Sequence, residues 1–383
     1  MTKSNIPLAL PDLTGNEEQY VVKAIRSSWI SSTGPFVARF EAEFAAACGT
    51  RAAITVCNGT IALHLALLAL DVKPGDEIIV PSLTYVATAN AAKYVGGIPV
   101  FADVDRQTWC LDPKKVQTAI TERTKGIIAV HLYGHAADMD EINAIAELHG
   151  LWVVEDAAEA PFATYKGRRT GSLAKIGTFS FYGNKIITCG EGGAITVSDP
   201  DLEARMRMIR GQGMDPRRRY YFPITGYNFR LTNVACAMLC AQLERYEQLV
   251  ERRLQICALY RNLLRDVPGI GMQKPAGWAK TSPWLFCITI DTPEFGRSRD
   301  QVMTMLAEQA IETRPFFIPL HSLPPFRDRA RADGSDLLVT EELGQTGLNL
   351  PTYTTMSDSD VRRVCEALMD TRRRITGYNT RRA

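Results

Sequence analysis

From about Arg51 onward, the sequence alternates short apolar runs of strand length with longer segments of helical length. The runs DEIIVPS, GIIAVHLYG and LWVVEDAA are continuously apolar at their centres, and they do not alternate apolar with polar residues. A strand that is apolar on both faces has to be covered on both faces, which is typical of a parallel sheet with helices packed on each side. The pattern therefore predicts an α/β fold built on a mostly parallel sheet.

The chain has 383 residues, which is enough for two domains. The α/β pattern predicts a large domain over residues 1–247. The stretch 231–266 has helical composition with little to interrupt it, and we expect one long helical segment that leads out of this domain. The runs LFCITI and QVMTMLAEQAI then predict a smaller α+β domain over residues 248–383.

Composition excludes several classes of protein. A net charge of +2 gives no reason to expect a nucleic acid or an acidic membrane surface as a partner. No apolar run is long enough to span a bilayer, and the opening MTKSNIPLAL lacks the apolar core of a signal peptide. Nine cysteines without a CxxC pair suit a reducing compartment. We therefore predict a cytoplasmic protein.

Polar residues gather at the predicted strand ends, where open α/β sheets bind their ligands. In CNGTIALHL, Gly59 lets the backbone approach an anion, and the Thr60 hydroxyl and the first helical amides face the same point. Asn58 or Thr60 could instead be a simple helix cap. Asp156, in VVEDAAEA, could cap the next helix or could face the ring nitrogen of a cofactor.

Lys185 lies between a strand-like run and a glycine cluster, in SFYGNKIITCGEGG. Most lysines in loops are solvated, but this position is predicted to lie near the crevice at the strand ends. Desolvation would lower the pKa of the amine, and a neutral amine can attack an aldehyde. Tyr85, in PSLTYVATAN, offers a flat face for stacking on a ring, with ordinary aromatic packing as the alternative.

Several ordered motifs resemble the DegT/DnrJ/EryC1/StrS family of sugar aminotransferases over nearly the whole chain. They are PSLTYVATAN, HLYGHAADMD, VVEDAAEA, GTFSFYGNKIITCGEGGAITV and RGQGMDPRRRYYFPITGYNFRLTN. The resemblance implies the fold-type-I aminotransferase architecture, pyridoxal 5′-phosphate as cofactor, and a homodimer with shared active sites. A lysine at position 185 favours transamination over the dehydration that a histidine-bearing branch of the family performs.

The resemblance also implies roles for individual residues. Lys185 matches the lysine that bonds to the cofactor and moves the proton, Asp156 the acid at the ring nitrogen, and Tyr85 the stacked aromatic. The phosphate contacts match Gly59, Thr60 and Ser180, with Asn228 contributed by the partner subunit. Glu159 matches a variable polar position beside the ring.

A nucleotide-linked 4-keto-6-deoxyhexose is the substrate that the resemblance implies, with L-glutamate as the amino donor. GDP-4-keto-6-deoxymannose is the first choice, and dTDP- or UDP-linked sugars stay open. Arg219 and Arg230 lie in a basic, aromatic stretch suited to a diphosphate, although such a stretch can also be a solvated loop. His321 matches a position near the substrate, with packing in the core or in a turn as the alternative.

Three other functions compete with this interpretation. The first is a regulator that binds the cofactor without catalysis. The second is a zinc hydrolase using His131, His135 and Asp138, because His-x3-His can bind zinc on a helix. The third is a nicotinamide dehydrogenase, which is disfavoured because no GxGxxG follows the first strand. We predict no metal site.

Overall fold

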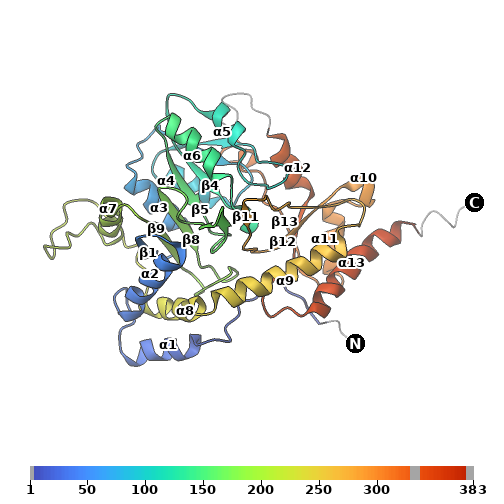
Figure 1. Cartoon of the computed structure of the whole chain (residues 1–383), viewed down its shortest axis with the longest axis horizontal. Helices are drawn as coiled ribbons and strands as arrows, with labels where there is room; N and C mark the ends of the chain where they lie inside the picture. The colour runs from blue at the N-terminus through green and yellow to red at the C-terminus, as the bar shows by residue number, and fades with distance from the viewer. Residues whose placement is uncertain (1–3, 328–336, 377–383) are drawn as a thin grey trace, which may run out of the picture.

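The computed structural model describes residues 4–327 and 337–376, and its largest element is a seven-stranded sheet (Figure 1). The strand order is β1-β9-β8-β5-β4-β2-β3. The strands are β1 (Ala52–Val56), β2 (Glu77–Pro81), β3 (Ile98–Ala102), β4 (Thr124–Val130), β5 (Trp152–Asp156), β8 (Ile176–Ser180) and β9 (Gly193–Val197). The run from β8 to β3 is parallel, and only β9 is antiparallel to its two neighbours. The predicted α/β class with a mostly parallel sheet is confirmed.

Helices cover both faces of this sheet, which explains why its strands are apolar throughout. In β2, Ile79 packs into one core cluster, whereas Ile78 and Val80 pack into another on the opposite face. The helices around the sheet are α1 (Glu17–Arg26), α2 (Pro35–Cys48), α3 (Gly59–Ala69), α4 (Ala87–Tyr94), α5 (Pro113–Ala119), α6 (Met139–Leu148) and α7 (Pro200–Arg210). Burial on both faces leaves the strand ends as the natural place for polar side chains.

A second, antiparallel sheet of four strands lies to the right of the first in Figure 1. Its order is β10 (Ile270–Met272), β12 (Phe286–Ile290), β14 (Gly347–Leu350) and β13 (Arg314–Pro315). The helices on this side are α9 (Tyr246–Leu264), α10 (Thr292–Phe295), α11 (Arg299–Ala307), α12 (Leu338–Thr346) and α13 (Asp358–Thr376). A three-stranded sheet joins β11 (Ala279–Lys280), β6 (Thr164–Tyr165) and β7 (Arg168–Arg169). Among the residues described, no helix is long and apolar enough to cross a membrane.

The predicted boundary between residues 247 and 248 falls inside α9, near its start. Ile6, from the predicted large domain, packs in the core of the second sheet and pairs with Ile311. The sequence offered no sign of this return of the N-terminus. The division into two domains at this position therefore stays a prediction, as does the cytoplasmic location.

The single long helical segment expected over residues 231–266 is wrong in one respect. The structure has two helices there, α8 (Asn233–Leu243) and α9, with a break at Glu244 and Arg245. The Glu244 carboxylate accepts hydrogen bonds from Tyr20, Asn16 and Arg39, all on the N-terminal helices or just before them. Contacts with distant segments surround this break, and no glycine or proline there marks it in the sequence.

Candidate active site

A cavity of about 580 Å³ opens at the carboxyl ends of the parallel strands. It is lined by seven of the residues singled out in the sequence, namely Gly59, Thr60, Tyr85, Asp156, Glu159, Ser180 and Lys185. They come from four separate stretches of the chain, and the order of the strands in the sheet brings them together. The crevice that topology predicts at the strand ends is therefore present, and it contains the predicted polar groups.

The predicted anion cradle is the N-terminus of α3, which lies at one side of this cavity. The helix α3 begins at Gly59, and the Asn58 side chain caps it by accepting the Ile61 N–H at 2.9 Å. The Gly59 and Thr60 amides of the same turn have no acceptor within the helix, so they are free to donate to an anion. A Cβ added at Gly59 would lie 2.8 Å from the Cβ of Ser180, so only glycine allows this close approach. Asn58 is therefore the cap, and the helix end lines the cavity, while anion binding at this end stays a prediction.

Asp156 is the last residue of β5 and is almost fully buried, with 5 % of its surface exposed. Its carboxylate accepts hydrogen bonds from the Thr88 hydroxyl at 2.8 Å and from the Ala158 N–H at 3.2 Å. Burial raises the pKa of Asp156, while these hydrogen bonds and the Lys185 charge act in the opposite direction. No helix begins at this residue, so the alternative of a helix cap is wrong.

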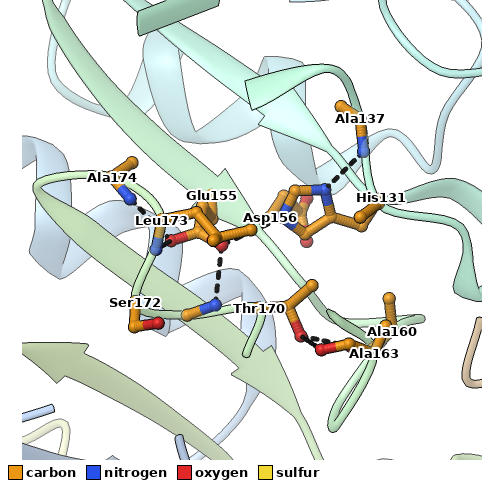
Figure 2. A network of polar contacts seen from close by, with 12 residues as sticks. His131, Ala137, Glu155, Asp156, Ala160, Ala163, Thr170, Ser172, Leu173 and Ala174 are labelled. Atoms are coloured by element: carbon orange, nitrogen blue, oxygen red, sulfur yellow. Dashed lines mark hydrogen bonds and ion pairs between the residues drawn. The ribbon is translucent and has the colours of Figure 1, made fainter. Parts of the chain in front are cut away.

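A buried polar network behind Asp156 fixes the end of β5 (Figure 2). The neighbouring Glu155 is fully buried, and its carboxylate accepts from the Gly171, Leu173 and Ala174 N–H groups at 2.6–2.9 Å. It also pairs with Nε2 of His131 at 3.0 Å, and the His131 N–H donates to the Asp156 carbonyl. Successive residues of a strand point to opposite faces. The Glu155 carboxylate therefore binds the turn at 171–174, and the Asp156 carboxylate faces the cavity.

The zinc hypothesis is not supported by the geometry. The Nδ1 atom of His131 accepts the Ala137 N–H, which leaves Nε2 to donate to Glu155. His135 is similarly engaged, because its Nδ1 bonds the Ala136 carbonyl and its Nε2 accepts the Ala276 N–H. Neither ring keeps a free nitrogen for a metal. Within the described ranges, no group of three or more His, Cys, Asp or Glu residues could hold a metal ion.

Lys185 directs its amine into the cavity. Its Nζ atom lies 3.7 Å from the centroid of the Trp284 ring. Burial lowers the pKa of Lys185, and the charges of Glu159 and Asp156 oppose this effect. The expectation that this lysine is desolvated near the strand ends therefore agrees with the structure. A lowered pKa increases the fraction of the amine that is neutral and nucleophilic at neutral pH.

Glu159 is a second buried carboxyl group near Lys185. It accepts the Tyr133 N–H at 2.9 Å and is 5 % exposed. Burial raises its pKa from the 4.5 of a solvated glutamate to about 7, against the effect of the Lys185 charge. The folded chain therefore keeps this proton at pH values where the unfolded chain has lost it.

This difference predicts a pH-dependent stability for the ligand-free chain. Between pH 4.5 and pH 7 the folded state holds more protons than the unfolded state, so the free energy of unfolding falls as the pH rises through this window. The variant Glu159→Gln lacks this term. We expect the stability of the wild type relative to the variant to fall by up to about 3 kcal/mol between pH 5 and pH 8 in urea denaturation. A constant difference across this range would contradict the prediction.

Four predicted residues lie outside the cavity of this chain. Arg219 is exposed in the segment after α7, which projects from the left of the molecule in Figure 1. Asn228 is exposed and pairs with Gly211, and Arg230 is partly buried. His321 is buried and bonds Ser82 at 2.8 Å and Glu341 at 3.3 Å. Their proposed contacts with a substrate or a partner subunit stay predictions.

The sequence did not single out the wall of the cavity that comes from the second sheet and its surroundings. This wall is made by Leu8, Trp284, Leu285, Arg314, Pro315, Phe317 and Asn349. These residues are far from the glycine-rich motifs in the sequence and stand in no recognisable pattern. Only the packing of the second sheet against the first places them beside Lys185.

Fold-type-I enzymes that use pyridoxal phosphate hold it at the carboxyl ends of a mostly parallel sheet, and this chain has that sheet and a matching cavity. It is a pyridoxal phosphate-dependent aminotransferase. The sequence profile of the DegT/DnrJ/EryC1/StrS aminotransferase family matches residues 11–369, and the chain belongs to this family.

Comparison with individual proteins agrees with this family assignment. The chain is 47 % identical to GDP-perosamine synthase of Caulobacter vibrioides, over 95 % of this chain and 97 % of the relative. It resembles the crystal structure of DesI in the presence of its TDP-sugar product, with 33 % identity, a TM-score of 0.90, and 98 % and 95 % of the two chains covered. It also resembles the PMP form of the putative sugar aminotransferase Spr1654 from Streptococcus pneumoniae, with 27 % identity, a TM-score of 0.91, and 99 % and 100 % covered.

Proposed function

We propose that this enzyme transfers the amino group of L-glutamate to C4 of a nucleotide-linked 4-keto-6-deoxyhexose, namely GDP-4-keto-6-deoxymannose, and so forms GDP-perosamine. The observation that carries the choice of sugar is the 47 % identity with a GDP-perosamine synthase along nearly the whole of both chains. The observation that carries the reaction type is the amine of Lys185 in one cavity with the buried carboxylate of Asp156.

The residues of the cavity fit the cofactor. Its phosphate suits the N-terminus of α3, where Gly59 approaches Ser180 closely enough to exclude a side chain. Asp156 is buried at the end of β5, where its carboxylate can hold a proton on a ring nitrogen of the cofactor. Tyr85 is 59 % exposed, and its ring faces the cavity, where a planar ligand would cover it. When bound, the cofactor supplies an electron sink for the carbanion formed at the reacting carbon.

The chain itself supplies attachment, orientation and proton transfer. Lys185 provides the amine that holds the cofactor and then carries the proton to and from the substrate carbon. The aromatic wall formed by Trp284 and Phe317 excludes water from this side of the amine. The Glu155 network keeps β5 in register, so that Asp156 stays in one orientation throughout the cycle.

Gly59 offers a direct test of the anion cradle. In the variant Gly59→Ala, the new Cβ would lie 2.8 Å from Ser180, so the start of α3 has to move away from β8. Such overpacking costs about 1–3 kcal/mol, and we expect cofactor affinity to fall at least about tenfold, measured by fluorescence titration. The variant Gly277→Ala is the matched control, because its Cβ would meet nothing within 4 Å. Equal affinities in the two variants would argue against the cradle.

A homodimer completes the site in this proposal. Asn228, Arg219 and Arg230 lie outside their own cavity, which suits a contribution to the cavity of a partner subunit. The exposed aromatics of the same segment, Tyr220, Tyr221 and Phe222, give it an apolar surface that a partner could cover. The guanidinium groups would then neutralise the diphosphate of the nucleotide sugar. Sedimentation of the purified protein measures the assembly directly.

Turnover with defined sugars tests the substrate. GDP-, dTDP- and UDP-linked 4-keto-6-deoxyhexoses are each offered with glutamate, and the amino sugar is detected by mass spectrometry. We expect the GDP sugar to give the highest kcat/KM. A preference for a dTDP- or UDP-linked sugar would correct the proposed nucleotide and leave the proposed reaction type unchanged. If no amine formed and glutamate left the cofactor spectrum unchanged, the chain would be a regulator that binds the cofactor without catalysis.

A further inference from the structure

We propose that Trp284 is a positioning residue for Lys185: its indole face receives the lysine amine whenever that amine carries no bond to the cofactor. The inference rests on the proposed role of Lys185 in the reaction. In each half of such a cycle the lysine is released and has to wait in reach of the reacting carbon. A fixed surface that holds the free amine would keep it in place for the proton transfer.

The contact itself is close. The Nζ atom of Lys185 lies 3.7 Å from the centroid of the Trp284 ring, well inside the roughly 6 Å at which a cation is attracted to an aromatic face. Tryptophan gives the strongest attraction of the aromatic side chains. Its ring is uncharged and offers no base over its face, so it can hold the amine without taking its proton. The same ring lines the cavity.

The indole is held rigidly on several sides. Its Nε1–H donates to the carbonyl of Asn184 at 2.8 Å, so the ring is tied to the residue that precedes Lys185. The Trp284 carbonyl accepts from the buried Arg253 on α9 at 2.6 Å. The Tyr133 ring lies within 19° of parallel to the indole, with 6.3 Å between the centroids. Only 8 % of Trp284 is exposed, so the face that meets the lysine has one position.

Three carboxylates and one guanidinium group line the cavity together with the Lys185 amine. The charged groups that line the cavity with Lys185 are Asp156 at the end of β5, Glu159 after it, Glu191 before β9, and Arg314 on β13. Within the described residues, no hydrogen bond or ion pair joins Nζ to any of these carboxylates. The amine rests on the indole although buried carboxylates share its cavity. This preference indicates a site for the amine, because ordinary packing of Trp284 would not require its face to meet a lysine.

The reactivity of Lys185 in the cofactor-free, full-length chain tests the inference without any turnover. The rate at which an amine reagent labels Lys185 is followed against pH by peptide mass spectrometry, in the wild type and in the variants Trp284→Leu and Trp284→Phe. Loss of the ring face destabilises the ammonium form of Lys185. We therefore expect the labelling midpoint, the pH at which the labelling rate is half its maximum, to fall by about one pH unit in Trp284→Leu. Phenylalanine keeps a face but loses the bond to Asn184, so its midpoint should lie between the other two.

Controls separate this effect from a general loss of structure. Trp278→Leu removes an indole that packs on Tyr165 and does not line the cavity, so its Lys185 midpoint should equal that of the wild type. The exposed Lys175 serves as an internal reference in every sample. An unchanged or raised midpoint in Trp284→Leu, or a fall of the same size in Trp278→Leu, would overturn the proposal. If Trp284→Leu does not fold, the Lys185 labelling midpoint of Trp284→Phe decides alone. A fall of this midpoint supports the proposal, and an unchanged midpoint overturns it.

Kinetics of the holoenzyme give a second, independent outcome. A displaced amine slows proton transfer and leaves glutamate binding intact, so Trp284→Leu should lower kcat about tenfold with KM for glutamate within about twofold. A rise in KM at constant kcat would show a binding role and contradict the proposal. The failure of the proposed function would look different: the wild type would then form no amino sugar from any nucleotide-linked keto sugar, whatever the labelling of Lys185 shows.

Discussion

Replacement of Lys185 by alanine is expected to lower kcat by roughly 10⁴-fold, the upper end of what general acid–base catalysis supplies. In the proposed reaction, this variant lacks both the amine that would hold the cofactor and the group that would move the proton. No other lysine lines the cavity in the part of the chain that the structure describes, so no neighbouring amine is placed to replace it. Turnover with glutamate and the keto sugar measures the loss.

Covalent attachment gives the same prediction a direct readout. After borohydride reduction, peptide mass spectrometry should find the cofactor on the peptide that contains Lys185 in the wild type, and on no peptide of Lys185→Ala. The variant Lys175→Ala is the matched control, since that lysine is exposed just before β8 and does not line the cavity. Substantial activity in Lys185→Ala, or attachment at another lysine, would refute the assignment of this residue.

Replacement of Asp156 by asparagine should lower kcat by about 10³-fold, with a smaller effect on the fold. Asparagine has nearly the same shape, and its carbonyl oxygen can still accept the hydrogen bond that Thr88 donates at 2.8 Å. It has no negative charge, so in the proposed site it could not hold a proton on the cofactor ring nitrogen, and the electron sink would weaken. Single-turnover kinetics with glutamate would locate the loss in the proton-transfer step.

The control for this variant is Asp201→Asn, which removes an exposed carboxylate in the first turn of α7. Both variants change the net charge equally, so a general electrostatic effect would appear in both. We expect wild-type activity in Asp201→Asn and unchanged circular dichroism in both proteins. If Asp156→Asn lost its cofactor or unfolded and kept no measurable first-turnover rate, a structural role for the carboxylate would replace the catalytic one.

The central sheet could be predicted because local and global signals agree there. Burial on both faces forces apolar residues along every strand, and this is visible in DEIIVPS or LWVVEDAA without any knowledge of neighbours. The strand-end motifs could be predicted for a related reason. A helix start such as that at Gly59 leaves its signature within a few residues, so it can be read locally.

The break between α8 and α9 could not be predicted, since no glycine or proline marks it. Glu244 and Arg245 are ordinary helix residues, and the contacts at the break involve Tyr20 and Asp12, more than two hundred positions away. The return of Ile6 to the second sheet is a similar case. Interactions between distant segments leave no local pattern, so they are invisible without coordinates.

The carboxylates of β5 show the same limit within the site. Glu155 and Asp156 are neighbours of the same chemical type, and the sequence alone does not say how their roles divide. The strand pleat decides this by turning one toward the turn at 171–174 and the other toward the cavity.

The sequence by itself determined the class of fold, the family, and the stretches that carry Lys185, Asp156 and Gly59, because each is marked by residues close to it in the chain. Only the tertiary structure decided which groups meet the lysine. The ring of Trp284 comes from nearly a hundred residues further on and is held by Asn184 and Arg253. Packing of two sheets against each other fixes such contacts, and packing depends on shapes in space that have no counterpart in the order of residues.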